Sequence, residues 1–301
     1  MTTPPGDEGP GEAPVVTPRL PALSFLPSRR GAFYLAHVMW NVWHIRSLGV
    51  GGAVVLASAG VGAADVVPQP EPVVGGGLVR VGQVTVDAQA RSASFPARVN
   101  MTHGTVEYAL VADYGKTHES LLVTDAAAVH VQSALLLLNL RATGTNAVRA
   151  EGVLEVPAES AVAVRVAWDG AEGRVTRRLE ELVDLVSNEG GRTVVTGRLA
   201  TGPWLFSGSW VTPEGFGAHF DGSYFALIRD AIAVLNNPRG DAVDDEIHAP
   251  SAARLPALGA QVTVTLSAEP AAAASWNAAF RRASAEGATN GGETVGRRRG
   301  P

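Results

Sequence analysis

The chain has 301 residues, of which 46% are apolar and 18% charged, so it is long enough for one large domain or two small ones and too apolar to be disordered throughout. Its 34 glycines and 19 prolines favour turns and β-structure over a helix bundle, and the absence of cysteine excludes disulfides, thiolate nucleophiles and an iron–sulfur cluster held by cysteines. Without residues 1–64, which hold four arginines and three acids, 20 basic side chains remain against 26 acidic ones. This balance argues against nucleic acid or an anionic membrane surface as a partner.

A segment within the first 64 residues predicts that the protein is exported. Residues 39–64 combine a cation, Arg46, with the apolar run Leu48–Val61 and a small-residue end, a combination typical of a secretory signal peptide. The apolar core is shorter than the ~20 residues that a membrane-spanning helix needs. We expect cleavage at its end and release into the periplasm or extracytoplasmic space, with membrane contact only through this segment if it stays uncleaved. Residues 1–38 are either a disordered leader or a misassigned start, because Met39 would itself begin a signal of ordinary length.

Residues 65–77, rich in proline and glycine, indicate a linker. The segments Val106–Ala112 and His118–Val123 flank a turn-forming Asp-Tyr-Gly-Lys sequence, and we expect them to form an antiparallel hairpin. A helix is predicted over about residues 126–139, capped by Thr124-Asp125, and its four consecutive leucines should be buried on most sides. Alternating residues predict the earlier strands at Leu78–Val81, Val84–Val86 and Ser94–Val99.

The second half of the chain also has strand patterns. An Asp169-Gly170 pair between Ala161–Trp168 and Arg174–Leu179 indicates a hairpin. Short helices are expected at Glu180–Val186 and Asp230–Leu235. Further strands are predicted at Trp204–Val211, Phe216–Phe220, Ser223–Ile228 and Gln261–Leu266.

These elements predict a β-rich α+β fold of antiparallel sheets with one buried helix and a C-terminal β lobe. We divide it into residues 78–145, with β hairpins plus the helix, and residues 146–267, a second β lobe of the same or a closely packed domain. In residues 268–301 an Ala-rich helix is expected, followed by a disordered tail from residue 283.

Two stretches resemble a known family. The first includes Val81-Gly-Gln-Val-Thr-Val-Asp, Phe95-Pro-Ala-Arg-Val-Asn-Met and Gly115-Lys-Thr-His-Glu-Ser-Leu-Leu, and the second includes Trp204-Leu-Phe-Ser-Gly-Ser and Asn236-Asn-Pro-Arg-Gly-Asp. They look like the YdjY domain of exported bacterial proteins, over most of residues 78–267. The resemblance implies export and names no reaction. Some members carry cysteines and are described as iron–sulfur proteins, a description that cannot apply to this cysteine-free chain.

Lys116 is the only lysine in the chain, beside 23 arginines. Arginine replaces lysine on most solvated faces but not where a compact ammonium group is needed. Lys116 therefore either marks such a site or has survived by chance, and both interpretations stay open.

Five side chains form a candidate polar or metal site: Glu107, Lys116, His118, Glu119 and His130. In the functional interpretation His118 or Glu119 joins His130 to bind a transition metal or to act as an acid–base pair, with Lys116 at the rim. Two ligands are fewer than a closed metal site needs. In the alternative, which we favour, Glu119 and His130 belong to a buried polar network and satisfy each other or the backbone.

Other motifs fail or are weak. A P-loop would need glycine in place of Leu110, a zincin would need histidine in place of Leu122, and no serine stands in a Gly-x-Ser-x-Gly elbow. The acidic loop Asp241, Asp244 and Asp245 could hold calcium, but it lacks EF-hand spacing and a solvated loop is favoured.

Aromatic residues in the second half alternate as in strands. We expect them to pack in the core, an interpretation that explains them better than a carbohydrate-binding platform. They are Trp204, Phe206, Trp210, Phe216, Phe220 and Tyr224.

The sequence thus predicts an exported binding or structural module, for which a protein partner is one option. The rival is a metal-dependent hydrolase or redox enzyme that uses His118 and His130.

Overall fold

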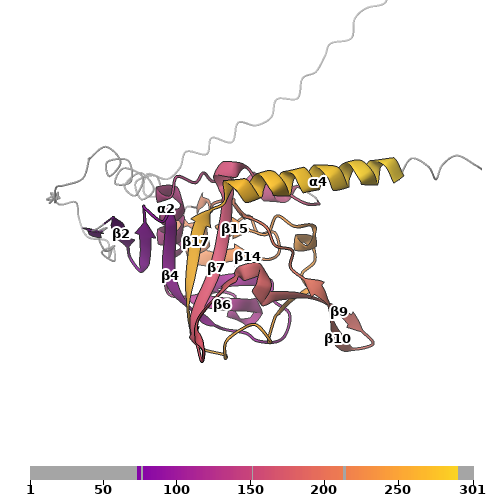
Figure 1. The fold of residues 1–301 in the computed structure, drawn as a ribbon, viewed down its shortest axis with the longest axis horizontal. Helices are drawn as coiled ribbons and strands as arrows, with labels where there is room; N and C mark the ends of the chain where they lie inside the picture. Colours follow the sequence, from indigo (N-terminus) through magenta and orange to yellow (C-terminus); the bar gives the residue numbers. More distant parts are fainter. Residues whose placement is uncertain (1–72, 76, 151, 213–214, 291–301) are drawn as a thin grey trace, which may run out of the picture.

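The computed structural model describes residues 73–75, 77–150, 152–212 and 215–290. Their centre is a closed ring of eight strands, a mixed barrel in which six neighbouring pairs are antiparallel and two are parallel (Figure 1). Around the ring the strands are β4 (Ser92–Val99), β17 (Gln261–Ala268), β7 (Ala161–Gly170), β11 (Trp204–Phe206), β15 (Leu235–Asn236), β14 (Ser223–Ala226), β5 (Tyr108–Ala112) and β6 (Ser120–Thr124).

The β-rich α+β class is confirmed, but sheets that are antiparallel throughout are not. The expected hairpin is wrong, because β5 and β6 run parallel, with Tyr108 opposite Ser120 and Leu110 opposite Leu122. Residues 113–119 carry the chain back along β5 and end in the 3-10 turn η1 (Thr117–Glu119). Seven residues reach at most about 25 Å, which is more than the roughly 17 Å length of a five-residue strand. A parallel connection this short is therefore geometrically feasible.

The main hydrophobic core joins strands from both halves of the chain, so residues 146–267 share one core with the strands before them. Phe95 of β4 and Phe225 of β14 meet edge to face, with ring centroids 6.4 Å apart. Trp204 and Phe206 of β11 belong to this core, whereas Leu205 between them packs in a second cluster. This division follows from the two-residue period of a strand.

An N-terminal meander of β1 (Val73–Gly75), β2 (Leu78–Val81) and β3 (Val84–Asp87) extends the sheet from the first half of β4. Helix α2 (Ala128–Leu137) packs against β2 and β3. The helix expected near residues 126–139 is thereby confirmed, but its predicted cap at Thr124-Asp125 is wrong, because the N-cap is Ala127 and makes no side-chain bond. Of the four leucines, Leu135 and Leu138 are buried and the two between them are partly exposed.

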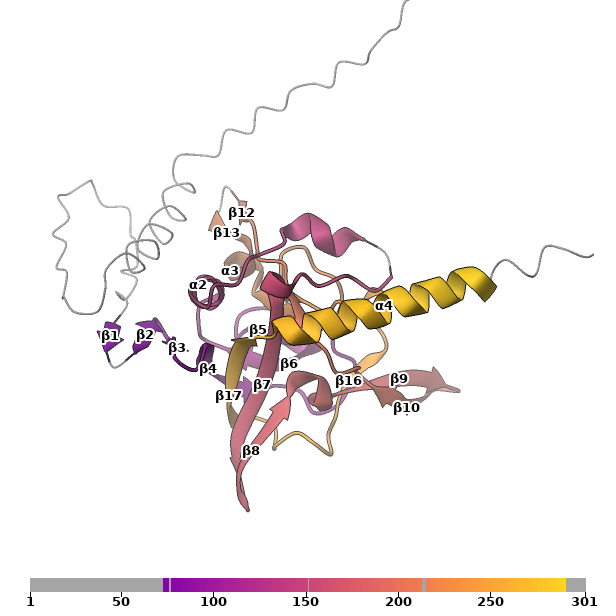
Figure 2. The same cartoon turned by 45° about the horizontal axis from the view of Figure 1, so that its top comes forward.

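The predicted hairpin around Asp169-Gly170 is also confirmed, with β7 paired to β8 (Gly173–Arg178) and the turn at residues 171–172. The helix expected at Glu180–Val186 is wrong. Only a 3-10 turn, η4 (Leu179–Leu182), forms there, and a strand follows it. A three-stranded sheet then projects from the barrel (Figure 2), made of β9 (Val183–Glu189), β10 (Arg192–Arg198) and β16 (His248–Pro250).

Two further expectations are wrong. Residues Asp230–Leu235 are not helical, because the side chain of Asp230 accepts from the backbone N–H of Ile232 and the amide of Asn236 bonds both backbone groups of Asp230. Such side-chain bonds compete with a helix. The segment predicted as a strand at Phe216–Phe220 is mainly the short helix α3 (Gly217–Asp221), which follows the two-residue strands β12 (Val211–Thr212) and β13 (Gly215–Phe216).

Helix α4 (Pro270–Asn290) confirms the Ala-rich helix and continues beyond residue 283, where a tail was expected. It crosses one end of the barrel and its far half extends beyond the barrel (Figure 1). Asn277 fastens it through hydrogen bonds to both backbone groups of Val156. The remaining 3-10 turns are η2 (Thr145–Arg149), η3 (Ala158–Ser160) and η5 (Gly240–Val243).

The predicted leader and signal peptide, most of the predicted linker and residues 291–301 lie outside the described residues. Among the helices of the described part, none is long and apolar enough to cross a membrane.

Candidate functional site

Lys116 lies at the centre of a compact polar cluster. Its Nζ donates to Tyr108 Oη at 2.8 Å, to Asp221 Oδ2 at 3.0 Å and to Ser223 Oγ at 3.2 Å. Asp230 Oδ2 lies 3.8 Å away and accepts from Tyr108 Oη at 3.1 Å. Ser223 also donates to Asp221. We call these five residues the Lys116 cluster.

The barrel topology creates this cluster. Tyr108 begins β5, Lys116 lies in the connection that follows, and Ser223 begins β14, the antiparallel neighbour of β5. Gly222 lets that neighbour approach, because at φ +77° a Cβ there would lie 2.7 Å from the Cα of Gly115. The close backbone contact holds the Lys116 connection against the end of α3.

The electrostatics of the cluster keep the lysine charged. Burial lowers the pKa of Lys116, but hydrogen bonds to Tyr108 and Asp221 and their charges outweigh burial, so its pKa is raised above the ordinary value. Burial raises the pKa of Tyr108 to about 12, partly opposed by the hydrogen bond from Lys116. Neither group titrates near neutral pH. The ammonium remains partly accessible, since the Lys116 side chain is 33% exposed.

The other predicted site residues divide into two groups. His118 is 77% exposed, and its Nε2 lies 3.5 Å from Glu119 Oε2. The pKa of Glu107 is raised, first by burial and then by the charges of Glu119 and Asp245, with Lys116 and His118 opposing. The structure therefore brings Glu107, His118 and Glu119 near the Lys116 connection.

His130, on α2, faces other neighbours. A Cβ on Gly82 would lie 2.2 Å from His130 Nδ1, so the imidazole lies against the β2–β3 turn. Burial and the charge of His219 lower its pKa. Within the part of the chain that the structure describes, no group of three or more His, Asp or Glu side chains is arranged to hold a metal ion. A site of His118 and His130 has no third ligand there, and it stays a prediction.

The acidic loop does not act as a unit. Asp244 and Asp245 are exposed, whereas Asp241 Oδ1 accepts from Asn237 Nδ2 at 2.7 Å and lies 3.2 Å from His248 Nε2. Burial raises the pKa of Asp241, but the bonds to His248 and Asn237 more than offset it, and the pKa lies below its ordinary value. Asp241 thus belongs to an internal network.

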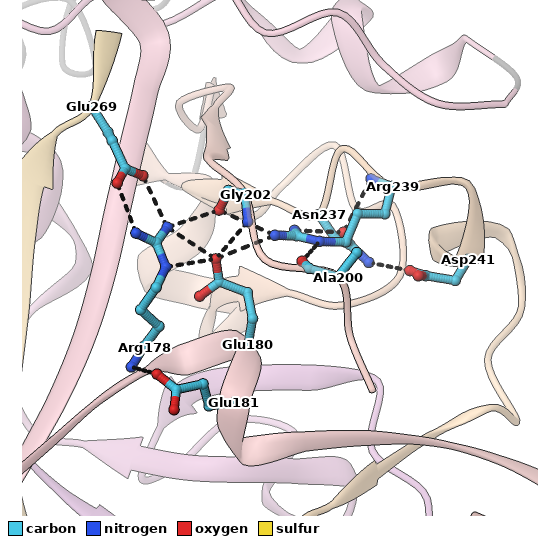
Figure 3. Close-up of polar contacts among 9 residues, drawn as sticks. All are labelled: Arg178, Glu180, Glu181, Ala200, Gly202, Asn237, Arg239, Asp241 and Glu269. Carbon is cyan, nitrogen blue, oxygen red and sulfur yellow. Dashed lines mark hydrogen bonds and ion pairs between the residues drawn. The ribbon is translucent and has the colours of Figure 1, made fainter. Parts of the chain in front are cut away.

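Figure 3 shows that network. Arg178 holds Glu269, the residue before α4, through two bonds of 2.7 and 2.9 Å, and it also contacts Glu180 Oε1 at 3.1 Å. Arg239, 2% exposed, bonds the same Glu180 oxygen and the backbone carbonyls of Ala200 and Gly202. Burial lowers the pKa of Arg239 to about 10, opposed by Glu180, so it remains charged at neutral pH. This network fastens α4 and the loop before β11 to η4.

The aromatic prediction holds for four of its six residues. Trp204, Phe206, Phe216 and Tyr224 are buried in the core, but Trp210 is 48% exposed and Phe220 57% exposed. Phe220 lies in α3, which also contributes Asp221 to the Lys116 cluster, and the backbone carbonyl of Trp210 accepts from the N–H of Gly217 at the start of that helix.

Sequence reasoning found Lys116 but missed its partners Tyr108, Asp221, Ser223 and Asp230. The compositional bias toward arginine was the signal for Lys116. Its acidic partners lie more than 100 residues away in the sequence, and only the pairing of β5 with β14 brings them close.

Two shallow surface depressions lie elsewhere. One of about 310 Å³ is lined by residues including Arg91 and Asn139, and one of about 220 Å³ by residues including Trp168 and Arg174. No predicted site residue lines either depression. The Lys116 cluster therefore lies outside both of them.

Comparison with family models matches the YdjY domain to residues 84–267, well over half of the chain. The matched range contains the Lys116 cluster and every strand of the barrel except the last residue of β17. Comparisons with curated proteins and with solved structures give no significant match.

Proposed function

Because this chain belongs to the YdjY-domain family, we propose that it is an exported, extracytoplasmic binding module that uses the surface around Lys116. The observation that carries the proposal is the Lys116 cluster, in which a partly exposed ammonium is held in one position by three hydrogen bonds. All three donor hydrogens of the ammonium are used inside the cluster, so Lys116 offers a ligand a fixed positive charge beside the carboxylate of Asp221, an arrangement that suits recognition of a polar ligand.

Acid–base chemistry has less support at this site. General acids and bases work best with pKa values near the operating pH, and the pKa values of Lys116 and Tyr108 are both raised away from it. The ion pair and the hydrogen bonds also stabilise Lys116 in its charged form, whereas a nucleophilic lysine would have to be neutral.

Metal content separates this proposal from a metal-dependent hydrolase or redox enzyme. The protein is purified from the periplasm without chelator and its Zn, Cu and Fe are measured. We expect less than one metal ion per chain, and for His118→Ala an unchanged metal content. Stoichiometric metal that is lost in His118→Ala would contradict the proposal.

Export is tested separately by N-terminal sequencing of the protein from the periplasmic fraction. We expect the sequence to begin at about Asp65. A chain that stays in the cytoplasm, or that keeps residues 39–64, would contradict cleavage and release.

A further inference from the structure

Beside the Lys116 cluster lies a set of exposed aromatic rings that the cluster does not use. Tyr114 is 58% exposed, Trp210 48% and Phe220 57%, and His219 is exposed as well. We call these four residues the aromatic face. Large apolar side chains are left in water at a cost, and four rings within two short segments of one region indicate a binding surface.

The rings are held in place by the backbone beneath them. A Cβ on Gly217 would lie 2.8 Å from the Trp210 ring, and a Cβ on Gly215 would lie 2.6 Å from the Phe220 ring. Both rings therefore pack on bare glycine backbone. These glycines are two residues apart, at most about 7 Å between Cα atoms, so the two rings pack on neighbouring positions of one short segment.

Tyr114 and Phe220 flank the imidazole of His219. The Tyr114 ring meets it at 6.0 Å and 78°, and the Phe220 ring at 5.9 Å and 71°. The Tyr114 hydroxyl donates to the backbone carbonyl of His219, which fixes the tyrosine to α3. Pre-positioned rings lose little conformational entropy when a ligand binds.

The chemistry around the rings is polar and acidic. Asp221 and Asp230 outnumber Lys116 in the cluster, and the charge of Asp113 acts on Tyr114. An anionic ligand would meet repulsion here, whereas the carboxylates can accept hydrogen bonds from hydroxyl groups.

We propose that the aromatic face, together with the edge of the Lys116 cluster, binds a glycan chain that carries no negative charge. This assignment rests on the proposed binding function and gives its ligand class. Pyranose rings present C–H groups on their faces, which stack on the electron-rich faces of aromatic rings, and hydroxyls at their edges, which would donate to the carboxylate of Asp221.

A protein partner fits the face less well. The fully buried core of a protein interface is more apolar than the rest of the surface, whereas this face borders the charged Lys116 cluster and the exposed large aliphatic residues of the described chain lie on other segments. They are Leu78, Val194, Val195, Val243 and Leu258.

The test is calorimetric titration of the full exported protein with a neutral β-linked glucose hexasaccharide and with its N-acetylglucosamine counterpart, with polygalacturonate as the anionic comparison. At least one neutral hexasaccharide should bind, and polygalacturonate should bind more weakly. Trp210→Ala and Phe220→Ala should each weaken binding by roughly tenfold, as expected for aromatic contacts at the centre of an interface. Gly217→Ala should also weaken it, because it displaces the Trp210 ring, and the matched control Leu258→Ala should leave it unchanged.

Binding by neither hexasaccharide would overturn the glycan assignment, as would affinity that Trp210→Ala and Phe220→Ala leave intact at an unchanged melting temperature. If neither binds but a component of the cell envelope shields Lys116, a partner of another class occupies this surface. The proposed function then stands and the glycan assignment fails.

Discussion

Arg239 and Glu180 form an ion pair in the interior of the protein, with Arg239 Nη2 3.3 Å from Glu180 Oε1 and side chains 2% and 0% exposed. The guanidinium also contacts two indoles, 5.5 Å from the centre of the Trp204 ring and 5.4 Å from that of Trp276 on α4. The pair thus connects η4, the barrel core and the C-terminal helix. Charges this deep are tolerated only when paired.

Removal of the Glu180 charge should therefore destabilise the fold. In Glu180→Gln the buried guanidinium of Arg239 loses its nearest carboxylate, and we expect the free energy of unfolding in urea to fall by about 3–5 kcal/mol. The exposed pair of Arg177 and Glu181, 4.0 Å apart, is the control, and Arg177→Gln should cost at most about 1 kcal/mol. Equal, small effects of both variants would show that the buried pair does not stabilise the protein.

The contact between Gly222 and Gly115 gives a second prediction. Gly222 and Gly259 have nearly the same φ, +77° and +78°, but a Cβ at Gly222 meets the backbone of Gly115 whereas one at Gly259 meets nothing within 4 Å. Gly259→Ala should cost only the backbone strain, about 1–2 kcal/mol. Gly222→Ala should cost about 1–3 kcal/mol more, since packed backbone must move. Similar melting temperatures for the two variants would contradict the close contact.

The lowered pKa of His130 predicts a dependence of stability on pH. The folded protein binds this proton less readily than the unfolded chain, whose histidine titrates near 6.5. The His130 contribution is therefore complete above that pH and is lost progressively as the pH falls below 6.5 toward the lower pKa of the folded state. Urea unfolding between pH 7.5 and 5 should show less loss of stability in His130→Gln than in the wild type. A wild-type slope in His130→Gln would refute the prediction.

Exchange of Lys116 for arginine tests whether this position needs a compact ammonium. A planar guanidinium cannot meet Tyr108, Asp221 and Ser223 in the same geometry, so Lys116→Arg should lower the free energy of unfolding by about 1–3 kcal/mol. The reverse exchange at the exposed Arg192 should change it by no more than about 0.5 kcal/mol. If Lys116→Arg is as stable as the wild type, the single lysine is a chance survivor.

Much of the fold could be predicted from the sequence because it depends on local patterns. The alternation of apolar and polar residues correctly predicted β17, the β7–β8 hairpin and the first strands. The run of leucines correctly predicted α2. The parallel pairing of β5 and β6 could not be predicted, because a connection of seven residues usually closes an antiparallel pair. The helix expected at Asp230–Leu235 failed since side-chain bonds of Asp230 and Asn236 replaced it.

Of the Lys116 cluster, only the central lysine could be predicted from the sequence. Composition singled out Lys116, but its partners depend on strand order. The aromatic alternation is the same for the buried Trp204 and the exposed Trp210, so the pattern could not separate core from surface. Gly215 and Gly217 are the local feature of the sequence that goes with aromatic rings packed directly on the backbone, here those of Phe220 and Trp210.

The most direct measurement of the central claim uses the fact that Lys116 is the only lysine. An amine-reactive acylating reagent modifies the α-amine of the chain and, more slowly because the pKa of Lys116 is raised, the small neutral fraction of Lys116, and mass spectrometry after long incubation gives the ratio of the two rates. If the surface around Lys116 binds an envelope component, this ratio should fall several-fold when purified protein is mixed with isolated cell envelopes, and return when the envelopes are removed. An unchanged ratio, at envelope concentrations that retain the protein in sedimentation, would place binding elsewhere and contradict the account.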